Sequence, residues 1–141
     1  MTYLEHVNIT VPDVQEAVRF LLLVDPDFVV RHDGIGDDGC RWLHIGDDNH
    51  YFALRDVPAD RANERVHKDM YHVGFNHFGI VVDDIAAVRA RLLAAGCTEL
   101  TPVEDHPHRR RAYFLDSVGF EWEFVEYLSA DPSKRNAYDL D

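Results

Sequence analysis

Hydrophobic and polar residues follow the same order twice along this chain. The alternating run from His6 to Val11 predicts a strand, because successive side chains of a strand point to opposite faces. A second run of the same kind extends from His77 to Val82. After each run, apolar residues recur with the spacing of a helix that has one buried side. The pattern therefore predicts two units that each begin with a strand and a helix.

Signals for helix ends accompany these patterns. Asp13 can cap the first helix, with Glu16 as its partner in a capping box. Gly96 supplies a C-terminal stop for the second helix. The apolar stripe expected on the first helix consists of Val14, Ala17, Val18 and Leu21. The stripe expected on the second helix consists of Ile85, Val88, Leu92 and Ala95. Each helix should therefore pack one side against a sheet.

Short alternating or apolar segments predict three further strands after each helix. In the first half these strands cover residues 28–31, 41–45 and 51–54. In the second half they cover residues 99–103, 111–115 and 121–127. Turn-rich segments separate strands at residues 34–39 and 116–119. The sequence thus predicts an α+β fold in which two βαβββ modules form a concave mixed sheet.

The whole chain is expected to be a single domain with this internal organisation. Module one covers residues 3–55, and module two covers residues 76–128. A polar linker with one helical turn, residues 56–75, connects the modules. The polar tail, residues 129–141, is expected either to pack on a partner subunit or to be disordered.

The two halves also match residue by residue. When the opening strands are superposed, His6 falls on His77. The later strands, with one residue of slack in a turn, add the matches of Trp42 with Tyr113 and of Ala53 with Glu123. Any two strand–helix units share some likeness, but matches in the same order and at the same spacing favour a duplicated module.

Composition narrows the range of functions. The chain has 141 residues and a mass of 16.3 kDa, which is room for one compact domain. Its formal net charge of −12 repels phosphate backbones and anionic lipids. No apolar run approaches the roughly 20 residues that span a bilayer, and the N-terminus does not read as a signal peptide. Cys40 and Cys97 form no CxxC pair, so we expect a reduced, cytoplasmic protein without nucleic-acid or membrane partners.

Two histidines at matching positions are the clearest sign of chemistry. A lone histidine at the start of a half-buried strand is commonly a hydrogen-bonded core residue, but packing alone gives no reason to place imidazole twice. Approximate two-fold symmetry would bring His6 and His77 together. Glu121 and Glu123 share one face of the last strand, and Glu126 lies on the other. These acids are either a solvated strand face or, with the histidines, ligands for a divalent first-row metal.

Two stretches of the second half carry a resemblance to a known family. They are His77-Phe-Gly-Ile-Val-Val-Asp-Asp and Tyr113-Phe-Leu-Asp-Ser-Val-Gly-Phe-Glu-Trp-Glu-Phe. Both resemble the vicinal oxygen chelate superfamily, which includes glyoxalase I, fosfomycin-resistance proteins, methylmalonyl-CoA epimerase, extradiol dioxygenases and bleomycin-resistance proteins. The family typically has aspartate-proline-aspartate-glycine in the second stretch, and this chain keeps Asp116 and Gly119 only. The resemblance covers residues 4–127 and implies a glyoxalase-like fold more specifically than an activity.

By this resemblance, the metal ligands fall on His6, His77 and Glu123. Glyoxalase-type members use a fourth ligand, an acid on the last strand of the first module. Its counterpart here is Ala53, which counts against a glyoxalase I activity. His50 could replace that acid, but its strand parity places it on the other face. Fosfomycin-resistance proteins and extradiol dioxygenases resemble the three-ligand set, which suits Fe, Mn, Zn, Ni or Co.

Aromatic and basic residues are candidates for substrate binding. Arg111 shares a strand face with Tyr113 and could hold a carboxylate or phosphate by a bidentate contact. Alternatively, the three arginines at 109–111 form a solvated loop patch or meet an acidic partner subunit. Trp42 and Tyr51 are either aromatic walls of the pocket or core residues.

The leading hypothesis is a metal-dependent enzyme that binds two neighbouring oxygens of a small substrate and stabilises the developing oxyanion. Lyase or isomerase, dioxygenase and thiol-transferase reactions all fit, with Glu121 and Tyr113 as the candidates for proton transfer. The alternative is a metal-free protein of the bleomycin-resistance type that sequesters a ligand. A third possibility is a duplicated module that has lost its site, with Ala53 as a sign of that loss.

The resemblance also implies a homodimer. In such pairs, modules of two chains or of one chain face each other across each sheet. A site would then combine His6 of one subunit with His77 and Glu123 of the other.

Overall fold

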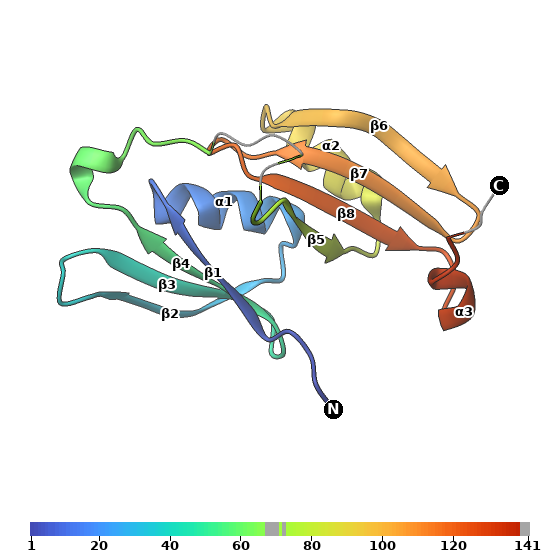
Figure 1. The fold of residues 1–141 in the computed structure, drawn as a ribbon, viewed down its shortest axis with the longest axis horizontal. Coiled ribbons are helices and arrows are strands. Elements are labelled where there is room, and N and C mark those ends of the chain that lie inside the picture. Colours follow the sequence, from blue (N-terminus) through green and yellow to red (C-terminus); the bar gives the residue numbers. More distant parts are fainter. Residues whose placement is uncertain (67–70, 72, 139–141) are drawn as a thin grey trace. The chain divides into compact units, whose positions relative to one another are not determined.

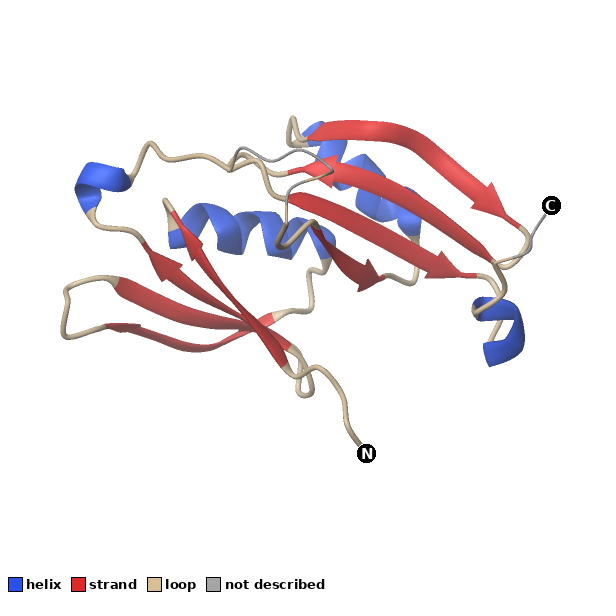
Figure 2. Ribbon diagram, in the orientation of Figure 1, coloured by secondary structure: helices blue, strands red, loops and turns tan. Residues whose placement is uncertain are grey.

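The structure is a computed structural model that describes residues 1–66, 71 and 73–138. Over this part of the chain the strands form two four-stranded sheets, in the orders β1-β4-β3-β2 and β5-β8-β7-β6 (Figures 1 and 2). The first half contains β1 (His6–Val11), α1 (Val14–Val24), β2 (Val29–Ile35), β3 (Arg41–Gly46), β4 (Tyr51–Asp56) and the 3₁₀ turn η1 (Ala59–Arg61). The second half contains β5 (His77–Val81), α2 (Ile85–Ala94), β6 (Thr98–His106), β7 (Arg109–Leu115), β8 (Glu121–Tyr127) and α3 (Pro132–Arg135).

Each sheet is mixed in the same way. β1 runs parallel to β4, and β5 runs parallel to β8. The other neighbouring strands are antiparallel, as expected for strands joined by short turns. α1 packs against β3 and β4, whereas α2 packs against β7 and β8. The predicted α+β fold of two βαβββ modules is confirmed.

The chain divides into two compact units, Met1–Arg65 and Val66–Asp141. In each unit the fully buried side chains lie between the helix and the sheet. They include Leu21, Leu43 and Ile45 in the first unit and Leu92, Phe114 and Phe124 in the second. Because strand side chains alternate, the polar and aromatic residues between these core positions lie on the opposite, open face of each sheet.

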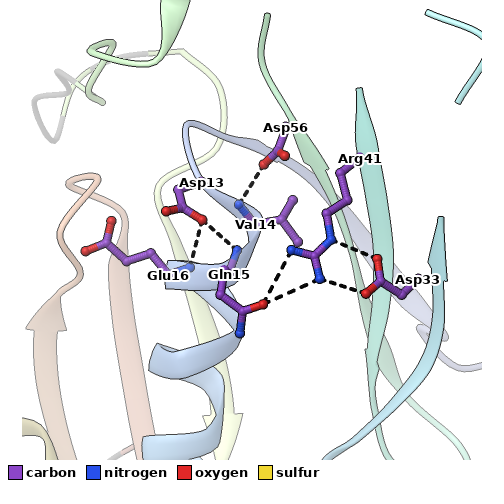
Figure 3. A network of polar contacts seen from close by, with 7 residues as sticks. All are labelled: Asp13, Val14, Gln15, Glu16, Asp33, Arg41 and Asp56. Carbon is purple, nitrogen blue, oxygen red and sulfur yellow. Dashed lines mark hydrogen bonds and ion pairs between the residues drawn. The ribbon is translucent and has the colours of Figure 1, made fainter. Parts of the chain in front are cut away.

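Hydrogen bonds at the start of α1 confirm the predicted cap. One carboxylate oxygen of Asp13 accepts hydrogen bonds from the backbone N–H groups of Gln15 (2.7 Å) and Glu16 (3.1 Å). The backbone N–H of Val14 donates to Asp56, at the end of β4, over 2.6 Å (Figure 3). This second acceptor ties the helix start to the sheet.

The second unit repeats this arrangement with different residues. Asp84 accepts a hydrogen bond from the backbone N–H of Ala87 at 3.0 Å. The backbone N–H of Ile85 donates to Glu126, at the end of β8, at 3.2 Å. Glu126 therefore faces the helix, on the side of β8 opposite to Glu123, as strand parity predicts.

α2 ends before the last residue of its predicted apolar stripe. Ile85, Val88 and Leu92 are buried. Ala95 is exposed, because it is the C-cap beyond the last helical turn. Gly96 follows with a φ of 82°, a backbone conformation that favours glycine, so the predicted stop is confirmed.

The three arginines at 109–111 lie in a strand rather than in a loop. β7 begins at Arg109, which pairs with His106 of β6 across a short turn. Pairing between β6 and β7 continues to His106 and Arg109, although these residues are polar. The two strands therefore form one long hairpin. β2 also extends further than its predicted segment.

Strand register corrects one match between the halves. His44 pairs with Ala53, and Tyr113 pairs with Glu123. Since Ala53 and Glu123 occupy equivalent places, His44 rather than Trp42 is the counterpart of Tyr113. The sequence misplaced this match because the turn is longer in the second half than in the first, over residues 116–120 and 47–50 respectively.

The linker and tail add short helical elements. η1 supplies the helical turn predicted for the linker, whose His67 and His72 lie outside the described residues. α3 lies in the tail, and the guanidinium of Arg109 donates to the backbone carbonyl of Arg135 at 3.0 Å. The described part of the tail therefore contacts the second unit's own sheet. Over the described residues, no helix has the length and hydrophobicity needed to span a membrane.

Candidate functional site

The second unit brings His77 and Glu123 together on the open face of its sheet. β5 and β8 are parallel neighbours, so side chains that share a face meet across them. His77 Nε2 lies 3.0 Å from Glu123 Oε2, and the Glu123 side chain is only 16% exposed. Glu121 Oε1 lies 3.8 Å from the other ring nitrogen, Nδ1. An imidazole and a half-enclosed carboxylate thus converge, as two ligands of one divalent metal would.

Asn76 contacts the opposite edge of the same imidazole. Its Oδ1 lies 3.0 Å from His77 Nδ1, within hydrogen-bond distance. Sequence reasoning missed Asn76, because an asparagine before a strand carries no signal of its own. Only the structure shows that the Asn76 side chain contacts the imidazole of His77.

Tyr113 borders the pair from β7. Burial and, next, its hydrogen bond to Glu123 raise the pKa of the Tyr113 hydroxyl to about 12. The ring stands edge-on to His77, with ring centroids 6.0 Å apart. At neutral pH this phenol therefore keeps its proton and donates a hydrogen bond to the Glu123 carboxylate.

Arg111 lies two residues before Tyr113 in β7, so both side chains are on the same face of the sheet. Its Nη2 lies 2.8 Å from Glu104 Oε2 and 3.1 Å from His106 Nε2, both on β6. Its Nη1 lies 3.9 Å from Glu123 Oε1. Its buried Nε has no hydrogen-bond partner within the described part of the chain. Sequence reasoning missed Glu104 and His106, because bulges in β6 interrupt the alternation that would have placed them.

The first unit holds His6 on the equivalent open face. The His6 ring stacks on Tyr51, with centroids 4.9 Å apart and planes 18° apart. His6 Nδ1 lies 3.0 Å from Glu5 Oε2. The place that Glu123 takes in the second unit is taken by Ala53, which is buried. A methyl group therefore stands where the second unit has a carboxylate.

Further rings extend from Tyr51 across the first sheet. The centroid distances are 4.7 Å from Tyr51 to His44, 5.2 Å from His44 to Trp42 and 3.9 Å from Trp42 to His32. We refer to these five residues as the aromatic row: His6, Tyr51, His44, Trp42 and His32. Trp42 and Tyr51 are half-buried members of this surface rather than enclosed core residues.

One histidine of the aromatic row, His44, has a pKa below its usual value. Burial, followed by the nearby His32 and His6 and by Arg31, lowers the pKa of His44. The guanidinium of Arg31 lies 4.7 Å from the centre of the Tyr51 ring. Aromatic side chains arranged in this way offer faces and edges to other flat, apolar groups.

The fit of these residues to a metal rests on the chemistry of the donors. Among the residues with described positions, no group of three or more His, Cys, Asp or Glu side chains is gathered closely enough to hold a metal ion. His77 and Glu123 form a pair with a nitrogen and an oxygen donor side by side. His6 occupies the same place in the first unit that His77 occupies in the second. Of the predicted ligands, His77 and Glu123 thus form a pair in the second unit, and His6 belongs to the first unit.

A family model described as the Glyoxalase/Bleomycin resistance protein/Dioxygenase superfamily matches residues 3–124. The chain belongs to this superfamily. The match spans both βαβββ modules and includes all three predicted ligand positions, so the resemblance inferred from the sequence motifs is confirmed. No curated protein sequence matches the chain.

Solved structures of this superfamily share the fold of the chain. A glyoxylase/bleomycin resistance protein/dioxygenase domain from Frankia sp. EAN1pec is 21% identical, with a TM-score of 0.72, over 90% of this chain and 98% of that chain. The fosfomycin resistance protein FosX from Mesorhizobium loti is 19% identical, with a TM-score of 0.70, over 96% and 97%. FosX from Listeria monocytogenes, whose crystal structure contains Mn(II) and a sulfate ion, is 14% identical, with a TM-score of 0.68, over 96% and 98%. At these identities the likeness shows the fold.

Proposed function

We propose that this chain is a divalent-metal-dependent enzyme that acts on a small, oxygen-bearing substrate. Its ligands are His6, His77 and Glu123. The observation that carries the proposal is the 3.0 Å approach of His77 Nε2 to Glu123 Oε2 on the open face of the second sheet. His6 joins them from the same chain or from a partner subunit. The Mn(II) in the Listeria FosX structure supports manganese as one of the metals to test.

The neighbouring residues of the second unit define what the site does to a substrate. The metal supplies Lewis-acid polarisation of two neighbouring oxygens when it is bound. Arg111 orients an anionic group, because a guanidinium can make a bidentate contact with a carboxylate or phosphate. Its contacts with Glu104 and Glu123 place the guanidinium beside the proposed metal site. Tyr113 donates a hydrogen bond from a hydroxyl that stays protonated. Glu121 is the nearby carboxylate that can accept a proton. These roles suit a lyase or isomerase, a dioxygenase or a thiol transferase.

Metal content of protein purified without chelator or nickel resin tests this proposal. We expect close to one equivalent per chain in the wild type and a loss of bound metal in His77→Ala and Glu123→Gln. Glu126→Gln is the matched control, because it removes a charge from the same strand on the face turned towards α2. Equal metal content in Glu123→Gln and Glu126→Gln, or no binding by the wild type after Mn(II), Fe(II) or Zn(II) is added, would overturn the proposal.

The aromatic row favours one second candidate, a metal-free protein that sequesters a flat aromatic ligand. The rings of the row contact one another across four strands and offer aromatic faces and edges to a flat ligand. The two tryptophans of the chain provide a test with an internal control, since Trp42 belongs to the row and Trp122 is buried and hydrogen-bonded to Asp116. When metal-free protein is titrated with 2-naphthoate, NMR spectra should show a shift of the Trp42 indole N–H resonance and no change in that of Trp122. Cyclohexanecarboxylate, which lacks a π face, should shift neither resonance. Equal shifts of both indoles, or no shift, would eliminate this candidate.

A further inference from the structure

Both repeat histidines make the same contact with the residue before them. His6 Nδ1 lies 3.0 Å from the Oε2 of Glu5. His77 Nδ1 lies 3.0 Å from the Oδ1 of Asn76. The two preceding residues differ in charge and length, yet each places a side-chain oxygen against the same ring nitrogen. The repeat has thus retained a contact as well as a residue type.

This contact favours one of the two ring nitrogens as the site of the proton. A neutral imidazole has one N–H donor and one acceptor nitrogen, and a neighbouring oxygen acceptor favours the proton on the nitrogen that it faces. An ionised Glu5 can only accept, so it favours the Nδ1–H form of His6. Asn76 Oδ1 favours the same form of His77, in competition with the Glu123 carboxylate, which lies 3.0 Å from Nε2. In both residues the lone pair then lies on Nε2.

In this tautomer the unprotonated Nε2 of His77 faces a carboxylate. With the proton on Nδ1, the Nε2 lone pair stands 3.0 Å from the Glu123 carboxylate oxygen. Two acceptor atoms at this distance repel each other, and a cation placed against both removes that repulsion. Glu121 lies 3.8 Å from Nδ1, beyond hydrogen-bond distance, so Asn76 is the nearer acceptor for the Nδ1 proton.

We propose that Glu5 and Asn76 are positioning residues that hold His6 and His77 in the Nδ1–H form and so present both Nε2 atoms as metal ligands. This inference rests on the proposed function, because the metal is what the two Nε2 atoms would bind. Partners of this kind orient a ligand ring and increase its basicity, and their loss typically lowers metal affinity about 10–100-fold. Glu5 adds a full negative charge at His6, whereas Asn76 adds only a dipole at His77.

Histidine tautomers in the metal-free protein provide the direct test. Long-range 1H–15N NMR spectra at mildly alkaline pH, where imidazoles are neutral, should show the Nδ1–H form for His6 and His77. In Asn76→Ala we expect His77 to change towards the Nε2–H form, since Glu123 is then its nearest acceptor. Asn76→Asp restores an acceptor and should restore the Nδ1–H form. Glu5→Ala should change His6 alone. An Nε2–H form of both histidines in the wild type would overturn the proposal.

Mn(II) affinity, measured by calorimetry, separates this inference from the proposed function. Asn76→Ala and Glu5→Ala should each weaken binding about 10–100-fold, and Asn76→Asp should recover most of that loss. If the wild type binds Mn(II) and the alanine variants bind it equally well, the positioning role is wrong and the metal enzyme stands. If the histidines have the Nδ1–H form but no divalent metal binds, the tautomer assignment stands, and the metal-ligand role fails together with the proposed function.

Discussion

On the open sheet faces, equivalent positions of the two modules hold residues of different chemistry. Ala53 replaces Glu123, and Trp42 takes the place of Arg111 on the open sheet face. His6 and His77 are the exception, since the same residue type and the same Nδ1 contact recur. The open face is therefore charged in the second unit and aromatic in the first. One face suits ionic and metal chemistry, and the other suits contact with flat apolar groups.

The pH dependence of His44 tests the charge state of the aromatic row. Its pKa is lowered in the folded protein by burial and by nearby positive charge, so the unfolded chain binds more protons near the usual value of 6.5. The contribution of His44 to stability is therefore complete above pH 6.5 and decreases as the pH falls towards the folded-state pKa. Urea unfolding at several pH values should show this decrease in the wild type and a weaker one in His44→Phe.

NMR titration provides the control for this prediction. The groups that act on His44 include His32, His6 and Arg31, which lower its pKa, and Glu5, which raises it. His32→Gln removes a positive neighbour and should therefore raise the pKa of His44. A wild-type His44 that titrates at or above 6.5, or that is unaffected by His32→Gln, would contradict this account of the row.

At the scale of elements, the turn between β7 and β8 depends on Asp116. One oxygen of its carboxylate accepts hydrogen bonds from the backbone N–H groups of Val118, Gly119 and Phe120, each at 2.9 Å. The other oxygen accepts from the indole N–H of Trp122 at 2.9 Å. The turn sets the start of β8, and hence the place of Glu123 on the sheet face.

We expect Asp116→Ala to destabilise the protein by about 2–3 kcal/mol, because several partly buried donors lose their acceptor. Asp116→Asn retains one oxygen but turns an N–H₂ group towards the Trp122 indole or the backbone donors. Its cost should be smaller, about 1–2 kcal/mol. Denaturant unfolding measures both changes, and a neutral Asp116→Ala would show that the turn forms without this carboxylate.

The start of α1 offers a matched pair of substitutions. Asp13→Ala removes the side-chain acceptor for the N–H groups of Gln15 and Glu16 and should cost about 1 kcal/mol. Asp13→Asn keeps a good capping residue and should cost little. Thermal unfolding followed by circular dichroism distinguishes the two, and equal losses would point to the charge of Asp13 rather than to its hydrogen bonds.

At the scale of the whole molecule, most charges of the arginine run are balanced within the second unit. Arg110 pairs with Asp105 at 2.9 Å, and Arg111 pairs with Glu104 at 2.8 Å. Arg109 is buried, and its guanidinium donates to the backbone of the tail. These arginines therefore have acidic or carbonyl partners within their own unit.

Mixed dimers test whether the proposed ligand set spans two subunits. His6→Ala and Glu123→Gln each remove one ligand, so neither homodimer should bind metal fully. In a mixed dimer, one shared site would contain all three native ligands and the other would lack two. Co-expression should therefore restore about a quarter of the wild-type metal content if subunits share sites in a homodimer. No restoration, in a preparation where two different affinity tags show that the two variants form mixed dimers, would assign each site to a single chain.

The sequence by itself determined the fold class, the repeat and the family of this protein. Strand and helix periodicity is a local property, so it could be read from neighbouring residues, as could the Asp13 cap and the Gly96 stop. Strand parity placed Glu123 on one face of β8 and Glu126 on the other. The same parity placed Arg111 and Tyr113 together. These features depend on spacing along one segment.

Only the tertiary structure decided which residues of different segments meet. The contacts of His77 with Asn76 and Glu123, the approach of Glu104 to Arg111 and the continuous aromatic row depend on register. Register in turn depends on turn length and on bulges, and a difference in turn length moved the counterpart of Tyr113 from Trp42 to His44. A register shift of two residues preserves the alternation of apolar and polar positions. The pattern along the chain is therefore the same for both registers and cannot distinguish them.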